Sequence, residues 1–495
     1  MRTYQQFEKG ISMMFDRNNR IRRIHLMVAV ALALVSFGVT AHAEDMTVAR
    51  VMAAGGSNTL RSNTLRVSSS NPRYFTDNSG KAIYLTGSHT WGNFQKWFEG
   101  HSGGGGTAGS PANFTAYLDV LQSYQHNFIR LWVADTAWSP IRQAAIEPQP
   151  YVRTGPGTAA DGGLKFNLNQ FNQAYFDTLR SQVIAARDRG IYVSLMLFDG
   201  WGISEYSAVP DNATWNYHPF RTTNNINGIN GDTNGDGIGL EYHTLNIAAI
   251  KTIQEAYVRK VVDTVNDLDN VLYEICNESG NYSTAWQYYF IDFIKSYEAG
   301  KPKQHPVGMT FQYSDRGGGP NSNLFSSNAD WASPGLGTYF ADPPAADGSK
   351  VVIADTDHIS SQSWDTTWIW RSFTRGLNPI VMDWWNGTRW DPIRRAMRDS
   401  RAYADKMNLA AMTPQGSLVS TGYALVNPGN EYLVYNSGSG TITLYNFPSG
   451  TYSVEWYNTA TNAAQTGSNI TGNGSNKTIT PPFSGAVLYL KKKEL

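Results

Sequence analysis

The sequence predicts an α/β fold, a (β/α)8 TIM barrel followed by a smaller C-terminal antiparallel β-sandwich domain. Eight short apolar segments alternate with helical patterns over a length typical of such barrels. After them, short segments of alternating polarity are bounded by Gly, Asn and Pro, as in β-sandwiches. We therefore place the barrel at residues 71–410 and the sandwich at residues 411–495, with Trp456 and Tyr457 as exposed strand aromatics.

The chain begins with a segment that predicts export. Basic residues at 17–25 precede an apolar run at 26–41, and Ala-His-Ala at 41–43 fits a cleavage site. The apolar run is short for a membrane span. We therefore assign residues 1–43 to a signal peptide and expect a secreted or periplasmic protein with no membrane attachment after cleavage. Residues 44–70 are rich in Ser, Asn, Gly and Thr and predict a linker.

Charge and cysteine content limit the partners and the means of stabilisation. Lys plus Arg and Asp plus Glu number 40 each, so no net field draws the chain to nucleic acid. Cys276 is the only cysteine, so it cannot form a disulfide within the chain and is predicted to be a buried strand residue. The oligomeric state does not follow from the sequence.

The eight barrel strands are predicted from continuous apolar runs, which are typical of parallel strands buried on both faces. Apolar residues at helical spacing separate most of them, for example at 114–124 and 250–265. No Gly-rich phosphate-binding fingerprint follows any strand, which disfavours a doubly wound open sheet. The predicted strands lie at 81–91, 128–135, 191–201, 271–278, 305–314, 328–333, 350–358 and 378–385.

Functional residues of such barrels collect at the carboxyl ends of the strands. The sequence places carboxylates, one Arg, His and Trp there, without a serine-nucleophile elbow or an H-E-x-x-H motif. Two facing carboxylates suit glycoside cleavage, because one protonates the leaving oxygen and the other attacks or activates water. The candidate residues are His89, Trp91, Arg130, Asp199, Trp201, Asn277, Glu278, Tyr313, Asp355, Asp357, His358, Asp383 and Trp384.

Several of these segments resemble known glycosidases. The Asn277-Glu278 pair that closes the fourth strand, with "FIRLW" at 128–132 on the second, resembles the clan A (β/α)8 glycoside hydrolases. More narrowly, the chain resembles the apiosidase-like family of bacterial glycoside hydrolases, in which a small terminal domain named for collagen binding is common. The segments that carry this closer resemblance are 71–91, 352–359, 375–385 and the C-terminal β domain.

The resemblance implies that Glu278 is the acid/base and that Asn277 hydrogen-bonds a sugar hydroxyl near the cleaved bond. The second catalytic acid would be Asp355, where the clan usually has Glu. Asp is one methylene shorter, which would leave room for a water molecule and favour inversion over retention. Asp357 competes with Asp355, because a shift of two residues keeps the same face of a strand. The other candidates are then expected to bind a polysaccharide or oligosaccharide.

Other interpretations of the same residues stay open. Glu274 is predicted to be a structural carboxylate, with Arg130 as its ion partner or as a substrate contact. The Asp in place of Glu on strand seven also fits a non-catalytic carbohydrate- or matrix-binding protein on a barrel scaffold. A third candidate is a metal-dependent hydrolase with ligands among Asp355, Asp357, His358 and Asp383.

A long loop at 202–242 is predicted to wall the substrate cleft. Within it Asp232, Asn234 and Asp236 alternate as in a calcium loop, but His243 stands where the closing Glu is expected. A polar turn is therefore the favoured interpretation. The predicted function requires no cofactor, and a structural calcium ion is the one that the sequence leaves open.

Overall fold

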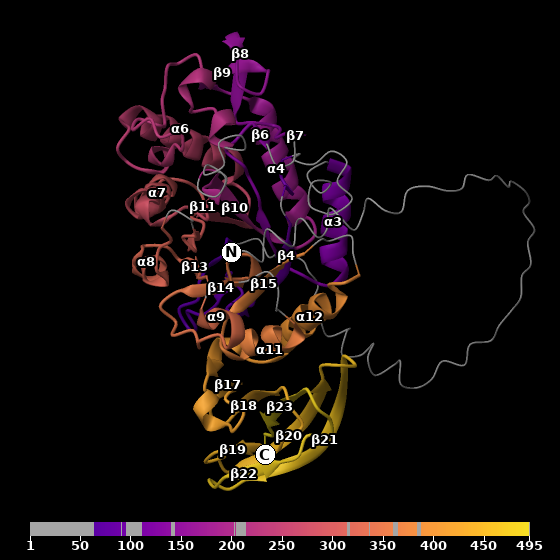
Figure 1. The fold of residues 1–495 in the computed structure, drawn as a ribbon. Helices are drawn as coiled ribbons and strands as arrows, with labels where there is room; N and C mark the ends of the chain where they lie inside the picture. The colour runs from indigo at the N-terminus through magenta and orange to yellow at the C-terminus, as the bar shows by residue number, and fades with distance from the viewer. Residues whose placement is uncertain are drawn as a thin grey trace, which may run out of the picture. The chain divides into compact units, whose positions relative to one another are not determined.

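The protein is described from a computed structural model (Figure 1). The predicted signal peptide, most of the predicted linker, Trp91 and Trp384 lie outside the residues that the structure describes. Within those residues, no helix is both long and apolar enough to cross a membrane. The described residues are 64–90, 92–95, 111–139, 144–201, 203, 214–313, 317–335, 337–359, 365–383 and 388–494.

Eight parallel strands close into a barrel in the cyclic order β4-β5-β10-β11-β12-β13-β14-β15, which confirms the predicted fold. Every residue of these strands is buried except the half-buried Met382, as the apolar runs predicted. Cys276 is among the buried residues. The strands are β4 (Gly87–His89), β5 (Phe128–Leu131), β10 (Tyr192–Asp199), β11 (Val271–Asn277), β12 (Val307–Thr310), β13 (Trp331–Ser333), β14 (Val351–Asp355) and β15 (Asn378–Met382).

Helices surround the barrel and bury their apolar faces against it (Figure 1). Short 3-10 turns connect several of them. The helices are α3 (Pro111–Ser123), α4 (Gln173–Arg187), α6 (Ala248–Val265), α7 (Thr284–Glu298), α8 (Asn321–Ser326), α9 (Thr338–Ala341), α10 (Thr356–Ile359), α11 (Thr366–Thr374) and α12 (Asp391–Lys406). The 3-10 turns are η2 (Thr214–Tyr217), η3 (Thr222–Asn224), η4 (Leu240–His243), η5 (Asn281–Ser283), η6 (Leu409–Ala411) and η7 (Gly416–Leu418).

A long antiparallel hairpin, which the sequence did not predict, interrupts the barrel between β5 and α4. Its strands are β8 (Tyr151–Thr158) and β9 (Leu164–Phe171), and Figure 1 shows it extending away from the barrel strands. Gly155-Pro156-Gly157 lies inside β8. Because Gly and Pro normally interrupt strands, the sequence pattern of this segment does not indicate a strand. Smaller sheets are formed by β1 (Arg66–Val67), β2 (Phe75–Thr76) and β3 (Ala82–Ile83), and by β6 (Trp138–Ser139) and β7 (Ala144–Ala145).

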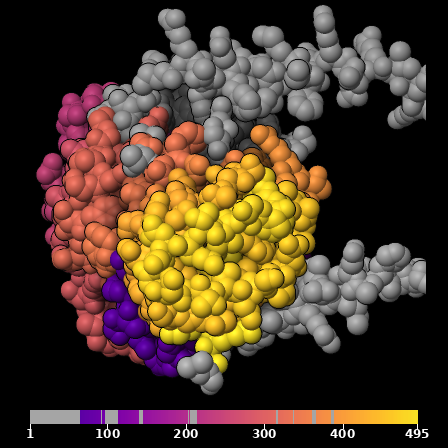
Figure 2. Space-filling model, turned by 90° about the horizontal axis from the view of Figure 1, so that it is seen from below, coloured from indigo at the N-terminus to yellow at the C-terminus, as the bar shows by residue number. Residues whose placement is uncertain are grey.

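The C-terminal region is an antiparallel β domain. A six-stranded sheet has the order β16-β17-β18-β23-β20-β21, and β19 pairs with β22. Figure 2 shows this domain in yellow beside the indigo N-terminal segment, where Asn71 donates hydrogen bonds to the carbonyls of Leu409 and Met412. The strands are β16 (Thr413–Pro414), β17 (Ala424–Asn427), β18 (Glu431–Asn436), β19 (Ile442–Leu444), β20 (Gly450–Asn458), β21 (Ala463–Gly472), β22 (Lys477–Ile479) and β23 (Ala486–Lys492).

The prediction that Trp456 and Tyr457 are exposed is wrong. The two side chains are only 5% and 4% exposed, because β20 is covered on both faces. Trp456 lies in a core with Leu444 of β19, whereas Tyr457 packs on Trp370 of α11 at 5.4 Å between ring centroids. Neither ring is therefore available as a flat surface for sugar.

Candidate active site

Arg130 lies at the centre of a buried ion cluster inside the barrel. From β5 it reaches across to β11, donating from Nε and Nη2 to Glu274 at 2.9 and 2.5 Å, and to Asn277 Oδ1 at 2.9 Å. Its Nη1 donates to Asp355 of β14 at 2.8 Å. Burial opposes the guanidinium charge, but Glu274 and Asp355 outweigh burial and raise the pKa of Arg130. The predicted ion pair between Arg130 and Glu274 is confirmed. Arg130 also contacts Asp355, which ends β14 at the rim of the barrel.

Asp355 is fully buried, and both of its carboxylate oxygens are occupied. Oδ1 accepts from His89 Nε2 and from the Asp357 amide, each at 2.9 Å, and Oδ2 accepts from Arg130. Burial by itself would raise the pKa of Asp355, but His89 and Arg130 outweigh burial and hold it well below its usual range. Asp355 is therefore an anion at neutral pH.

The tautomer of His89 follows from its second partner. The indole N–H of Trp132 can only donate, and it points at His89 Nδ1 at 2.9 Å. Nδ1 must therefore accept, which puts the ring hydrogen on Nε2, where it faces Asp355. Trp132 thus orients the donor that Asp355 needs.

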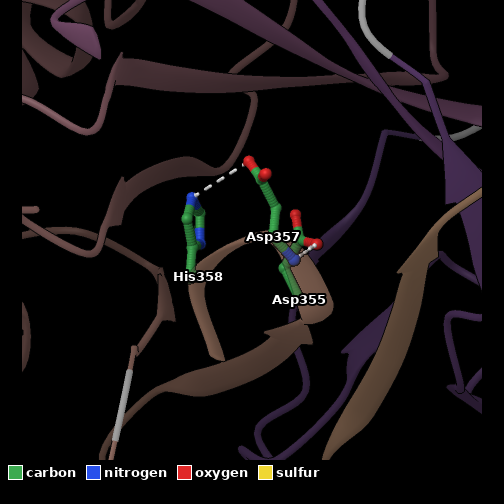
Figure 3. A group of neighbouring side chains, drawn as sticks. All are labelled: Asp355, Asp357 and His358. Atoms are coloured by element: carbon green, nitrogen blue, oxygen red, sulfur yellow. Dashed lines mark hydrogen bonds and ion pairs between the residues drawn. The ribbon is translucent and has the colours of Figure 1, made fainter. Parts of the chain in front are cut away.

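The chain turns into α10 directly after Asp355, and Asp357 and His358 both lie in this turn (Figure 3). Asp357 Oδ2 accepts from Arg130 at 3.3 Å, and burial together with the neighbouring Asp355 raises the pKa of Asp357 to about 6. His358 contacts Ser333 Oγ at 2.9 Å and Asn277 Oδ1 at 3.3 Å. Burial and Arg130 lower the pKa of His358 to about 3, so its ring is neutral at neutral pH.

Asp355, Asp357 and His358 form a group that could hold a metal ion, because one ligand atom from each lies within 4.8 Å of the others. Asp357 and His358 would point to opposite faces of a strand, but both lie in the helical turn α10, which allows their side chains to approach each other. Arg130, however, already donates to both carboxylates, so a metal ion would share its ligands with a buried guanidinium. The donor set fits a hard metal only in part.

Glu278 is the first residue beyond the β11 ladder, which ends where Asn277 pairs with Asp199. Its φ of 48° is left-handed, which is uncommon for a residue other than Gly. Gly200 explains part of this arrangement, because a Cβ there would lie 2.5 Å from the Cα of Ser279. The backbone after β11 therefore packs directly on Gly200, and Glu278 is 9% exposed at the rim.

Asn277 is fully buried, with an amide that is only half satisfied. Its Oδ1 accepts from Arg130, and within the described residues its Nδ2 has no hydrogen-bond partner. An unsatisfied buried donor costs about 1–3 kcal/mol, so a ligand that supplies an acceptor would gain that free energy.

The structure gives the remaining predicted residues other partners. Asp199 accepts from the Trp201 amide at 3.2 Å, and Trp201 is half-buried. Tyr313 is 36% exposed and stacks on Phe311. Asp383 accepts two hydrogen bonds from Arg394 of α12, at 3.0 and 3.1 Å. Burial raises the pKa of Asp383 despite this pairing.

The candidate calcium loop holds its carboxylates close to backbone amides. Asp232 accepts from the amides of Gly235 and Gly237 at 2.9 and 3.0 Å. Glu241, which the sequence analysis did not consider, accepts from the Asn234 amide at 3.0 Å. The Glu241 carboxylate therefore stands two residues before His243, the position where a calcium loop would have its closing ligand. The polar turn stays the prediction, and a structural calcium ion stays its alternative.

Ser333 and Trp132 are the positioning residues that the list of candidates missed. Both lie at or just beyond a strand end, Ser333 closing β13 and Trp132 following β5. Their places at the rim were the available signal. Ser333 is not among the residue types selected there, which were carboxylates, Arg, His and Trp, whereas Trp132 is of a selected type and was left out of the list.

Comparison with known proteins supports the fold. A model of a domain of unknown function, DUF6298, matches residues 113–314. Curated proteins give no match. A glycoside hydrolase family 5 structure from Bacteroides vulgatus is similar with a TM-score of 0.54 and 12% identity, over 87% of this chain and 93% of that one. A second structure, described as a glycoside hydrolase, has a TM-score of 0.54 and 11% identity, over 88% of this chain and 99% of that one.

The fold is therefore one that glycoside hydrolases have, a TIM barrel with additional antiparallel sheets at its C-terminal end. At this identity the likeness concerns the fold alone. The closer resemblance to the apiosidase-like family, and to a collagen-binding domain, stays a prediction.

Proposed function

We propose that the protein is an exported glycoside hydrolase that cleaves O-glycosidic bonds of a polysaccharide or oligosaccharide. The observation that carries this proposal is that two acids in different environments lie at the carboxyl ends of parallel strands of one barrel. Asp355 ends β14 as an anion between Arg130 and His89, and Glu278 follows β11 at the edge of the interior. A fold shared with glycoside hydrolases supports the same reaction class.

In this proposal Asp355 supplies the negative charge, and Glu278 protonates the leaving oxygen. A carboxylate must be ionised to attack the sugar or to activate water, and the low pKa of Asp355 meets that need. Asn277 Nδ2 then donates to a sugar hydroxyl, which satisfies the buried donor.

Asp357 is the residue that competes with Asp355. Its side chain is 7% exposed, whereas that of Asp355 is 0% exposed, so a substrate approaching from the rim meets Asp357 first. A pKa of about 6 also suits an acid that exchanges protons near neutral pH. The experiment must therefore separate these two neighbours.

The test measures hydrolysis by Glu278→Gln, Asp355→Asn and Asp357→Asn on a glycan panel and on matching aryl glycosides. We expect Asp355→Asn to lose roughly 10³-fold or more of kcat with every substrate. Glu278→Gln should lose about 10²–10⁴-fold on natural glycans. It should lose far less on a dinitrophenyl glycoside, because that leaving group needs no proton.

The control is Asp119→Asn, which changes an exposed carboxylate paired with Arg189 and should keep full activity. Wild-type turnover by Asp355→Asn, together with a large loss in Asp357→Asn, would transfer the role to Asp357. Glycan binding without release of any product would favour the carbohydrate-binding alternative. Activity lost in a strong chelator would favour the metal-dependent one.

The export part of the proposal has its own test. Expression with the full leader in a bacterial host should give a protein outside the cytoplasm whose N-terminus, read by mass spectrometry, begins near Glu44. A cytoplasmic protein that keeps residues 1–43 would contradict it.

A further inference from the structure

A small cavity lies behind the barrel wall, on the helix side of β10. Phe198 of β10 and Tyr257 of α6, whose ring centroids are 5.6 Å apart, form part of its wall. The free space is about 20 Å³, which is enough for one molecule the size of water. The Arg130 cluster lies on the other side of the same wall, inside the barrel. The residues around the cavity include Asp135, Gln149, Tyr151, Phe198, Tyr242 and Tyr257.

Asp135 brings a carboxyl group to this cavity, and within the described residues it has no partner that carries a charge. Its side chain is 13% exposed, and Oδ2 accepts one hydrogen bond, from the Asp199 amide at 3.2 Å. Among the described residues, the nearest group that could carry positive charge is His243, whose Nε2 is 3.7 Å away. Burial lowers the pKa of His243 to about 3, so this ring is neutral. Burial also raises the pKa of Asp135 to about 8.

Gln149 adds a second acceptor to the cavity. Its Nε2 donates to the carbonyls of Thr136 and Ile146 at 3.0 and 2.9 Å, which identifies the other end of the amide as the oxygen. That oxygen is buried and, within the described part of the chain, has no partner. Gln149 is 5% exposed, so solvent does not readily satisfy the oxygen.

His243 supplies a third acceptor near Asp135. The Ser279 hydroxyl donates to Tyr282 at 3.3 Å, so the 3.3 Å contact between Ser279 Oγ and His243 Nδ1 takes its hydrogen from the ring. The neutral ring then has a lone pair on Nε2, and this atom is buried without a hydrogen-bond partner among the described residues. Gln149 Oε1 and His243 Nε2 are therefore buried acceptors without a donor among the described residues, and the Asp135 carboxyl lies 3.7 Å from the second of them.

We infer that the cavity binds a small monovalent cation, such as ammonium or potassium. One carboxylate balances one positive charge, and its oxygens with Gln149 Oε1 provide ligands of the type that hard cations prefer. The tyrosine and phenylalanine rings of the wall favour a cation over an anion, because ring faces are electron-rich. A divalent ion would leave uncompensated charge. Ammonium and potassium are close to water in size, as the free space demands.

The thermal midpoint of unfolding tests this inference without relying on catalysis. Wild-type protein is unfolded in equal concentrations of potassium, ammonium and choline chloride at pH 8. We expect Tm to be about 2–5 °C higher in potassium or ammonium than in choline, which is too large for the cavity. In Asp135→Asn this difference should vanish, whereas the surface variant Asp119→Asn should keep it.

Crystals soaked in rubidium or thallium chloride provide a second measurement, on unaltered protein, should Asp135→Asn fail to fold. An anomalous peak between Asp135 and Gln149 would support the site. Equal Tm values in all three salts, or a cavity that holds only water in the rubidium soak, would overturn the inference. So would a salt response that survives in Asp135→Asn. Since neither measurement uses a substrate, the outcome is independent of the proposed glycosidase function.

Discussion

Asp355 at the end of β14 and Asp135 in the segment after β5 both lie in buried surroundings, yet their pKa values move in opposite directions. Asp355 is the more deeply buried, and its pKa lies below the usual range. Asp135 retains some exposure, and its pKa is raised to about 8. The difference lies in their neighbours, since Asp355 accepts from Arg130 and His89 while Asp135 accepts from one backbone amide.

Pairing, rather than depth of burial, therefore decides which acid is ionised. Inside the barrel, the Arg130 guanidinium lies between the carboxylates of Glu274 and Asp355 and stabilises their negative charges. The outer cavity contains no fixed cation among the described residues, so its acid must take a proton or a mobile ion.

The largest expected effect is the loss of the shared guanidinium. Arg130→Met leaves Glu274 and Asp355 buried without a counter-charge, and we expect the free energy of unfolding to fall by about 3–5 kcal/mol. Urea unfolding measures the change. Adding Glu274→Gln should restore part of the loss, because one of the unpaired charges is then gone.

The matched control is Arg187→Met, which breaks an exposed pair with Asp188 and should cost less than about 1 kcal/mol. If Arg130→Met cost no more than this control, the pairing of Asp355 would not be what keeps it ionised.

The two acids should also give opposite dependences of stability on pH. Unfolded Asp titrates near about pH 3.9, whereas folded Asp135 keeps its proton to about pH 8. Between these values only the unfolded chain loses the proton, so stability falls by about 1.4 kcal/mol per pH unit as pH rises. Asp355 has a lowered folded pKa, so its contribution is present above about pH 4 and is lost as pH falls.

Urea unfolding of wild type and Asp135→Asn in choline chloride, at pH values from 5 to 8, isolates the first of these terms. The variant lacks the titrating group, so the wild type should lose stability relative to it as pH rises. Parallel stability curves across this range would show that Asp135 is not held protonated.

A smaller effect is expected where Trp132 orients His89. Trp132→Phe keeps an aromatic ring beside the imidazole, whose plane lies at 13° to that of the indole, but removes the N–H that fixes the tautomer. We expect a loss of about 1 kcal/mol in stability. If Asp355 is catalytic, kcat should fall about tenfold with little change in KM. Nitrogen NMR of the histidines should show His89 leaving the single Nε2–H tautomer, and an unchanged tautomer would contradict the assigned role of Trp132.

The sequence predicted the barrel better than it predicted the environments of the acids. Continuous apolar runs identified the eight strands, because strands buried on both faces are rich in apolar residues, although β4 and β11 also bury polar side chains. Rim residues followed from strand order alone. The β8–β9 hairpin was missed because β8 contains Gly and Pro. Trp456 was wrongly predicted to be exposed, because the residues of β20 do not indicate that other residues cover this face of the strand.

The cavity residues show a further limit of sequence analysis. Asp135 and Gln149 line the cavity and His243 lies beside Asp135, yet the three come from separate segments and share no spacing, so only the folded chain brings them together. The pKa of Asp135 also follows only from the folded structure, because it depends on burial without a positive charge nearby among the described residues. Motifs identify groups that face a substrate, but they carry no information on the partners that determine ionisation.

The smallest expected effect concerns calcium at the loop of Asp232 and Asp236. Both carboxylates accept from amides of their own loop, and Glu241 accepts from the Asn234 amide, so backbone amides hold these oxygens in place. If the loop binds calcium at a dissociation constant of about 1 mM, adding 1 mM calcium stabilises the protein by only about 0.4 kcal/mol. Tm should therefore rise slightly in calcium relative to EDTA, and not in Asp232→Asn. A rise that persists in this variant would place the ion elsewhere, for example at Asp355 and Asp357, which are within reach of one metal ion.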